Sequence, residues 1–340
     1  MPVAWAFRRG IIARMMRIAL ITAGLAIFAL CSEKAFAWAQ EGHAAVAAIA
    51  QNLISPTTQT KVQELLAKGG DKDLISIASW ADLVIIAAHD AGPLRGNQEA
   101  MEFNQKFPKS AMWHFVNLPL GATSYEQVRN FTTPDDVIHA ISRCIDVLES
   151  PTPDPGAFTK VQALRLLVHF VGDIHQPLHC GIGFYSFSET SPPQLITTPA
   201  DAVDKPSDRG GNLLFYGPNA TEQLHALWDR VLVEGVDESP DYSVLAAFLA
   251  KSYVPKEIVK TPGDYHNWAE IWAIESVQVA AIVYQGIRFE TAEFDAGQHL
   301  ARIDITLPTN YLERNKGYAA QQLARAGVRL AQLLDSIRWQ

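Results

Sequence analysis

The feature that most constrains the fold is an apolar helical segment, residues 159–173, that carries a histidine and an aspartate on one face. His169 and Asp173 lie four residues apart in "LVHFVGDIHQPLH", residues 167–179, so on a helix both side chains point the same way. Glycine and proline then end the helix and let His179 return to the same region. A lone histidine on an apolar helix is usually a hydrogen-bonded core residue. Three histidines and an aspartate within eleven residues instead favour a metal site.

Further histidines and aspartates repeat or extend this pattern. His225 and Asp229 in "LHALWD" have the same spacing of four, while Asp82 ends "SWAD" and His114 lies in "MWHFVN". Taken alone, Asp82 fits a helix cap and His114 fits a buried core position. The convergent candidates are His43, Asp82, His114, His169, Asp173, His179, His225 and Asp229. Carboxylates mixed with imidazoles, without thiolates, suit zinc in a hydrolytic site, and eight side chains imply two or three ions.

Apolar residues at helical spacing over most of the chain predict an all-α, multi-helix domain. The predicted helices span residues 40–53, 57–68, 134–150, 159–173, 265–285 and 310–337. Thr133 is the predicted N-cap of the third helix. Strand-like alternation is best at 213–216 and 303–307. The segment 181–209, rich in Ser, Thr, Pro and Asp, predicts a long surface loop.

The first 37 residues have the pattern of a signal peptide. Four arginines precede an uncharged, largely apolar run over 18–30, and Ala35-x-Ala37 fits the small-residue cleavage rule. Two rival readings are a twin-arginine signal at Arg8-Arg9 and lipidation at Cys31, and both match their patterns poorly. We therefore expect export to the periplasm or beyond the cell, with cleavage between Ala37 and Trp38 and a mature domain of residues 38–340. No later stretch is long enough for a transmembrane helix, so we expect no stable membrane association, and we expect a monomer.

The net charge excludes one class of nucleic-acid-binding protein. The chain carries −8 at neutral pH, and the leader contributes five basic residues and one acid, or +4, so the mature part carries −8 − 4 = −12. A protein that binds polyanions by counterion release should be basic. If this protein handles phosphates, metal cations must supply the attraction. Cys144 and Cys180 remain after cleavage, and the sequence leaves open whether they pair.

Seven motifs occur in a fixed order from Trp38 to the C-terminal half of the chain. They are the tryptophan that opens the mature chain, GH, WAD, WHF, HFxGDxHQPLH, GGN and HxxWD. With these motifs the chain resembles the S1/P1 nuclease family, which shares its fold with the zinc-dependent phospholipases C. The resemblance implies a single compact multi-helix domain with a trinuclear zinc cleft.

The resemblance also implies which residues hold the three Zn²⁺ ions. The ligands fall into three sets: Asp82, His114 and His169; His179, His225 and Asp229; and Trp38 with His43, with Asp173 bridging the first and third sets. Trp38 would bind through its free α-amino group and its carbonyl oxygen, which requires cleavage directly before it. The resemblance assigns catalysis to Asp82 and Asp173.

The implied activity is hydrolysis of single-stranded DNA and RNA to 5′-nucleotides, with 3′-nucleotidase activity. Phe115 matches the position on which a base stacks. Asn117 stands where some fungal members carry a base-reading aspartate, and Asn212 belongs to the GGN motif at the edge of the cleft. His175 is not a family ligand, and we interpret it as a residue that supports the ligands.

The chain departs from the family pattern at Ile85. Many members carry arginine or lysine there, where it helps to hold phosphate. Another cation, Arg95, Lys109 or Arg209, is needed to replace it, or phosphate binding is weaker.

Two alternative functions follow from the same residues. A phospholipase C of the same fold would carry glutamate in place of Asp229, and the GGN motif and Phe115 also favour nucleic acid. A zinc-binding protein with little catalysis is suggested by Ile85, but the intact ligand set argues against it.

Overall fold

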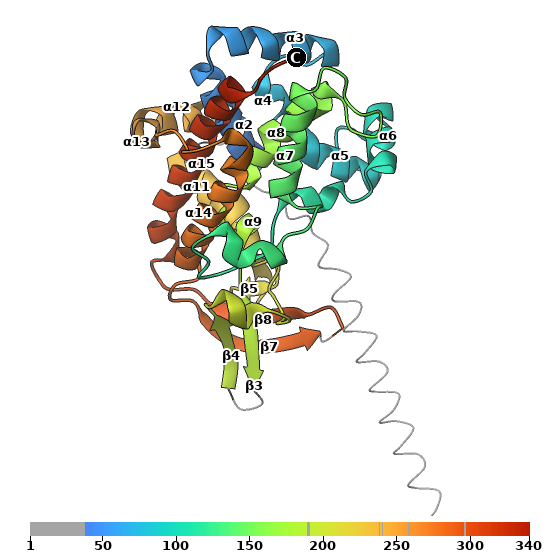
Figure 1. The fold of residues 1–340 in the computed structure, drawn as a ribbon. Coiled ribbons are helices and arrows are strands. Elements are labelled where there is room, and N and C mark those ends of the chain that lie inside the picture. The colour runs from blue at the N-terminus through green and yellow to red at the C-terminus, as the bar shows by residue number, and fades with distance from the viewer. Residues whose placement is uncertain (1–37, 189–190, 238, 240, 258, 296) are drawn as a thin grey trace, which may run out of the picture. The chain divides into compact units, whose positions relative to one another are not determined.

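The computed structural model describes residues 38–188, 191–237, 239, 241–257, 259–295 and 297–340. The predicted signal peptide lies outside the described residues. The described part is a single compact domain dominated by helices (Figure 1), which confirms the predicted all-α class. The α-helices are α2 Gln40–Leu53, α3 Pro56–Gly69, α4 Leu74–Ile77, α5 Trp80–Ala88, α6 Gln98–Lys106, α7 Val137–Glu149, α8 Lys160–Asp173, α9 Pro177–Cys180, α10 Leu224–Ala226, α11 Leu232–Asp237, α12 Tyr242–Ser252, α13 Val254–Glu257, α14 Trp268–Val283 and α15 Tyr311–Ser336.

Helix α8 is surrounded by other helices of the domain. It packs against α7, α2, α3, α4, α5 and α15 (Figure 1). Every residue from Ala163 to Asp173 is buried, so this helix has no solvent face and reads as apolar all round. His169 and Asp173 at its C-terminal end are both fully buried. Burying a polar side chain costs free energy unless it has a partner. The two side chains at the end of α8 therefore need hydrogen bonds, counter-charges or a bound cation.

All six predicted helices are present, and their ends follow from local capping. Thr159 caps α8 in a reciprocal capping box with Gln162. The predicted N-cap of α7 is wrong. Asp136 caps that helix instead, because its carboxylate accepts hydrogen bonds from the backbone N–H of His139 (3.0 Å) and of Thr133 (2.8 Å). The proline at 134 therefore lies before the helix rather than inside its first turn.

The predicted surface loop at 181–209 is partly wrong. It contains the strands β2 Gly181–Ile182, β3 Phe184–Ser188 and β4 Ser191–Ile196 and the short helix η3 Pro199–Ala202. Strands β3 and β4 form an antiparallel pair. Strand β4 contains two prolines, which are unfavourable in strands, so the sequence did not predict it. They are tolerated because β4 has only one neighbouring strand in this pair, and its other edge needs no N–H donor.

The other strands form one small sheet. Its order is β6 Glu222–Gln223, β5 Leu214–Tyr216, β8 Leu300–Thr306 and β7 Arg288–Asp295, with β5 parallel to β8. Strands β5 and β8 correspond to the two predicted strand segments. A further short strand, β1 Leu118–Pro119, pairs with β2. The register of β1 beside β2 places the segment after His114 next to the segment after His179.

Neither cysteine of the domain forms a disulfide. Cys144 and Cys180 are both free and buried, which answers the question left open by the sequence. Burial raises the pKa of both thiols above the usual range. Among the described residues, no helix combines the length and apolar character needed to cross a bilayer.

The corrected cap of α7 can be tested by two alanine substitutions. Asp136→Ala should lower the free energy of unfolding by about 1–2 kcal/mol, because two backbone N–H groups lose their acceptor. Thr133→Ala, at the exposed residue that the sequence favoured, should change it by less than about 0.5 kcal/mol. Urea unfolding at a fixed zinc concentration measures both. A larger loss for Thr133→Ala than for Asp136→Ala would contradict the assignment.

Candidate metal centre

The structure brings all eight histidine and aspartate candidates to one buried region. They come from segments far apart in the chain: His43 from α2, Asp82 from α5, His114 from the 3₁₀ turn η1 Ser110–His114, His169 and Asp173 from α8, His179 from α9, His225 from α10 and Asp229 from the π-helical turn η4 Leu227–Val231. Each of the eight is at least nine-tenths buried. A π-helical turn is rare and often marks a functional position.

The first group of ligand atoms gathers around Asp173. One carboxylate oxygen, Oδ2, lies 3.0 Å from Nδ1 of His114 and 3.3 Å from Nε2 of His169. The other oxygen, Oδ1, lies 3.4 Å from Nε2 of His43. One oxygen of this carboxylate thus faces His114 and His169 and the other faces His43, which is the arrangement that a bridging ligand requires.

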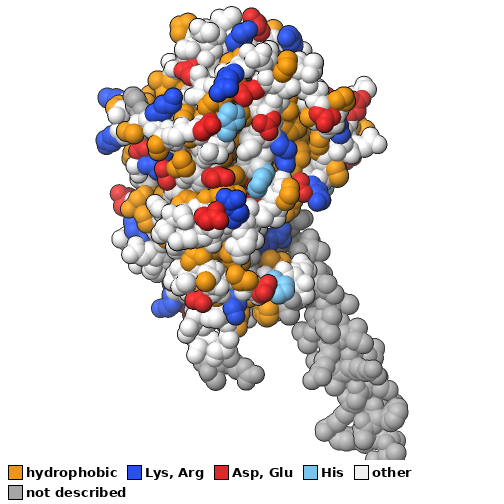
Figure 2. Space-filling view, viewed as in Figure 1, with side chains coloured by type: hydrophobic (Ala, Val, Ile, Leu, Met, Phe, Trp, Pro, Cys, Tyr) orange, Lys and Arg blue, Asp and Glu red, His pale blue; other side chains and the backbone are white. Residues whose placement is uncertain are grey.

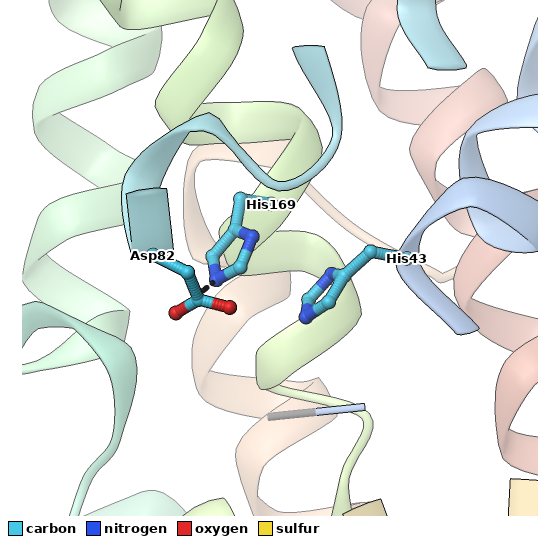
Figure 3. Close-up of side chains that lie close together, drawn as sticks. All are labelled: His43, Asp82 and His169. Carbon is cyan, nitrogen blue, oxygen red and sulfur yellow. Dashed lines mark ion pairs between the residues drawn. The ribbon is translucent and has the colours of Figure 1, made fainter. Parts of the chain in front are cut away.

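Asp82 completes this first group. Its Oδ1 lies 3.4 Å from Nε2 of His169 and 3.5 Å from Nδ1 of His114. Figure 3 shows Asp82, His169 and His43 pointing into the same space, each from a different helix. The rings of His43 and His169 are stacked, with centroids 3.9 Å apart. The ligand atoms of these three residues all lie within 4.8 Å of one another, close enough to share one cation.

A second group is formed by His179, His225 and Asp229. Nε2 of His225 lies 3.2 Å from Nε2 of His179 and 3.3 Å from Oδ2 of Asp229. These three atoms also fit within 4.8 Å. Two imidazoles and one carboxylate, all buried, are a donor set typical of zinc.

The chemistry of the donor atoms fits metal ions better than a network of hydrogen bonds. Both ring nitrogens of His43 and both carboxylate oxygens of Asp173 are buried and have no hydrogen-bond partner among the described residues. Leaving such atoms without a partner costs free energy. Cations between these atoms would remove that cost.

Backbone carbonyls fix the orientation of three histidine rings. Nδ1–H of His169 donates to the carbonyl of Ala78 (2.7 Å), and Nδ1–H of His179 donates to that of His114 (2.7 Å). Nδ1–H of His225 donates to the carbonyl of Gly210 (2.6 Å). With the proton held on Nδ1, Nε2 keeps its lone pair and faces the cluster, as a metal ligand must.

Two residues that the sequence did not single out support the second group: Gln176 in the HFxGDxHQPLH motif and Asp208, which lies outside the motifs. Nε2–H of Gln176 donates to Oδ1 of Asp229 (2.7 Å), and its own Oε1 accepts from the backbone N–H of Leu178 (2.6 Å). Asp208 accepts a hydrogen bond from the backbone N–H of Gly211 (3.1 Å) and so holds the GGN turn. Gln176 lies next to Pro177 inside the longest motif, and this position in the sequence could have identified it as a residue of the site. No sequence pattern marks Asp208, because its hydrogen-bond partners Tyr185 and Tyr284 lie far from it in the chain, in β3 and directly after α14.

Burial away from water shifts the pKa values of several candidate ligands. Burial, followed by the nearby His169, lowers the pKa of His43 to about 3. Burial, followed by His179, lowers the pKa of His225 to about 3. Burial raises the pKa of Asp229 well above its usual range, although Gln176 opposes this shift. Neutral imidazoles can donate a lone pair to a cation, and a bound cation would supply the positive charge that favours ionisation of Asp229.

Burial and the neighbouring charges act in opposite directions on the pKa values of His169 and Asp173. Burial acts to lower the pKa of His169, but the carboxylates of Asp173 and Asp82 raise it well above the usual value. Burial acts to raise the pKa of Asp173, but His169 and His114 hold it well below the usual value. Both shifts favour the charged forms of this pair while no cation is bound, and a bound cation would replace the proton on Nε2 of His169.

Trp38 lies beside the cluster. Its side chain is fully buried, and its indole N–H donates to the carbonyl of Gly172 (3.0 Å). The backbone N–H of Ala39 donates to the carbonyl of Asp229 (2.7 Å), so the start of the described chain is tied to a candidate ligand. A Cβ on Gly42 would lie 2.7 Å from Cβ of Trp38, which explains the glycine of the GH motif.

Gly172 explains the glycine in HFxGD. A Cβ at this position would lie 2.7 Å from Nδ1 of His43. The helix α2 can approach α8 closely enough to place His43 beside Asp173 only because this side chain is missing.

The remaining predicted residues lie at the surface of the site or outside it. Phe115 and Asn117 follow His114 and are partly exposed, as is Asn212, whose amide donates to the carbonyl of Arg209 (2.9 Å). His175 does not contact the ligands. Its Nδ1–H donates to the carbonyl of Val171, and its Nε2 accepts from Arg329 (3.1 Å). Its supporting role is therefore in the packing between α8 and α15.

The family is shown by a family model described as S1/P1 Nuclease, which matches residues 38–338. The chain belongs to the S1/P1 nuclease family. Among similar proteins, "Endonuclease 2" of Arabidopsis thaliana is 26% identical over 322 residues, covering 88% of this chain and 90% of that protein. "Nuclease S1" of Aspergillus oryzae is 26% identical over 338 residues, covering 95% of this chain and 98% of that protein. "Nuclease P1" of Penicillium citrinum is 30% identical over 145 residues, covering 42% and 47%.

Membership of the S1/P1 nuclease family makes the two donor groups the candidate active site of a hydrolase that acts on nucleic acids. No other cluster of three or more histidine, cysteine or acidic side chains with ligand spacing occurs in the described part of the chain. The chemistry therefore has one place in this domain.

Proposed function

We propose that this protein is an exported, zinc-dependent nuclease that hydrolyses single-stranded DNA and RNA to 5′-nucleotides and also acts on 3′-nucleotides. The observation that carries the proposal is Asp173, whose one oxygen faces His114 and His169 while the other faces His43. Membership of the S1/P1 nuclease family supports the same activity.

The donor set suits three Zn²⁺ ions. Asp82, His114 and His169 would hold one, and the set of His179, His225 and Asp229 would hold another. His43 and the amino group and carbonyl of Trp38 would hold a third, with Asp173 shared between this ion and the first. Bound zinc would lower the pKa of a water between two ions and neutralise charge on the phosphate.

The protein's own residues supply orientation and a dry environment. The carbonyls of Ala78, His114 and Gly210 hold three imidazoles in the ligand tautomer. The carboxylates of Asp82 and Asp173 supply the negative charge that keeps the cations in a buried site. Such preorganised groups need little rearrangement during the reaction.

Recognition of the strand would fall to residues at the rim. The partly exposed ring of Phe115 adjoins His114, so a base stacked on it would place its phosphate near the donor groups. Stacking requires an unpaired base, which accounts for a single-strand preference. Asn117 can both donate and accept hydrogen bonds and would contact the base, and Asn212 would contact the strand at the cleft edge.

The surface charge supports attraction by metal ions rather than by a basic face. Figure 2 shows acidic and basic side chains interspersed on the visible face, with no continuous basic patch there. The chain is acidic in total, at −8. Counterion release alone would not hold a polyanion on such a surface.

The central experiment gives the purified mature protein single-stranded DNA, RNA, 3′-AMP and phosphatidylcholine, with and without a chelator. We expect hydrolysis of the first three only, its loss with chelator, and about three zinc ions per chain by elemental analysis. Asp173→Asn should abolish turnover and lower the zinc content, because a shared ligand is lost. Hydrolysis of phosphatidylcholine alone would favour a phospholipase C. Zinc binding without any hydrolysis would favour a zinc-binding protein.

The role of Trp38 can be tested by adding one methionine before it. The tryptophan nitrogen then becomes an amide, which is a poor ligand at neutral pH. We expect this form to lose about one zinc ion and its hydrolysis of single-stranded RNA, whereas protein cleaved after Ala37 keeps both. Mass spectrometry confirms each N-terminus. Equal zinc content and equal rates in the two forms would refute ligation by the N-terminus.

The stacking role of Phe115 predicts a loss of binding. Phe115→Ala should weaken binding of single-stranded substrates by about 1–3 kcal/mol, seen as a higher KM. Phe187→Ala, at an exposed phenylalanine on β3, is the control and should leave KM unchanged. An unchanged KM for Phe115→Ala on every nucleotide substrate would remove the proposed base site.

A further inference from the structure

The turn Asp208–Asn212 carries an arginine in an unusual backbone conformation. Arg209 has φ of 54°, in the left-handed region that favours glycine, and Gly210 and Gly211 follow with φ of 65° and 79°. A residue with a side chain rarely adopts this conformation and is less stable there than glycine. A third glycine would relieve the strain, so the arginine side chain itself is the feature to explain.

The turn is held rigidly from both sides. The buried carboxylate of Asp208 accepts hydrogen bonds from the hydroxyls of Tyr185 (2.7 Å) and Tyr284 (2.9 Å) and from the backbone N–H of Gly211 (3.1 Å). On the other side, the carbonyl of Gly210 accepts the Nδ1–H of His225 (2.6 Å). The backbone of Arg209 is thus fixed one peptide away from the group that orients a candidate ligand.

The side chain of Arg209 is exposed, and none of the described residues forms an ion pair or a side-chain hydrogen bond with it. The other two cations considered from the sequence are already engaged. Arg95 forms an ion pair with Asp90 (2.8 Å), and Lys109 forms one with Asp135 (2.9 Å). Of these three cations, only Arg209 forms no ion pair with a described residue.

We propose that the guanidinium of Arg209 binds the reacting phosphate group of the substrate beside the group of His179, His225 and Asp229. The planar guanidinium donates two parallel N–H groups to phosphate oxygens, which a lysine cannot do. The rigid turn limits the freedom that the arginine loses on binding. This inference rests on the proposed nuclease function, and it makes Arg209 a substrate-binding residue that compensates for the apolar Ile85.

The test compares the zinc-loaded wild type with Arg209→Gly, Arg209→Lys and Lys205→Gln. Glycine adopts a positive φ without strain, so Arg209→Gly removes the charge while the turn is kept. Lys205 is exposed in the same segment and is the matched control for loss of one positive charge. Elemental analysis verifies that the zinc content is equal, and thermal unfolding verifies that no variant is less stable than the wild type. The readouts are the Kd of inorganic phosphate by calorimetry and the KM and kcat for 3′-AMP.

We expect Arg209→Gly to raise the phosphate Kd and the KM for 3′-AMP by about tenfold or more. Arg209→Lys should lie between this variant and the wild type, and Lys205→Gln should match the wild type. An unchanged Kd and KM in Arg209→Gly would overturn the inference, as would an effect confined to long strands. If the wild type cleaves no nucleotide at all, the proposed function fails, and the phosphate Kd alone decides the role of Arg209.

Discussion

The burial of Asp173 at the end of α8 is the constraint on which the rest of the site depends. A fully buried carboxylate must be compensated, and here the compensation comes from imidazoles on two other segments, His43 and His114, as well as from His169 on its own helix. Bringing His43 this close requires Gly172, and seating Trp38 requires Gly42. The close approach of α2 and α8, which these two glycines permit, thus places a compensating imidazole beside Asp173.

The sequence predicted which histidines and aspartates lie close together because their spacing has a local physical meaning. His169 and Asp173 share a helix face, and the structure places them together as that spacing requires. The helices were predictable for the same reason, since their apolar residues recur at a fixed period. The strands in 181–209 were not, because β4 owes its conformation to pairing with β3 and not to its own residues.

The residues missed by the sequence act through contacts between distant segments. Asp208 accepts hydrogen bonds from Tyr185 in β3 and from Tyr284 directly after α14, and no local sequence pattern predicts these contacts. His175 shows the opposite error: its place in a metal-binding motif suggested support of the ligands, yet its ring faces Arg329 on α15. Proximity along the chain is therefore a good guide to a helix face and a poor guide to the direction of a side chain after the helix has ended.

The two free cysteines have a consequence for how the protein reaches its folded state. Cys144 and Cys180 are buried with raised thiol pKa values, so neither is reactive while the domain is folded. The folded domain of residues 38–340 therefore contains no disulfide that oxidising surroundings would have to supply. Protein folded in reducing and in oxidising surroundings should carry the same two buried thiols, so a difference in function between two such preparations would have to originate elsewhere in the molecule.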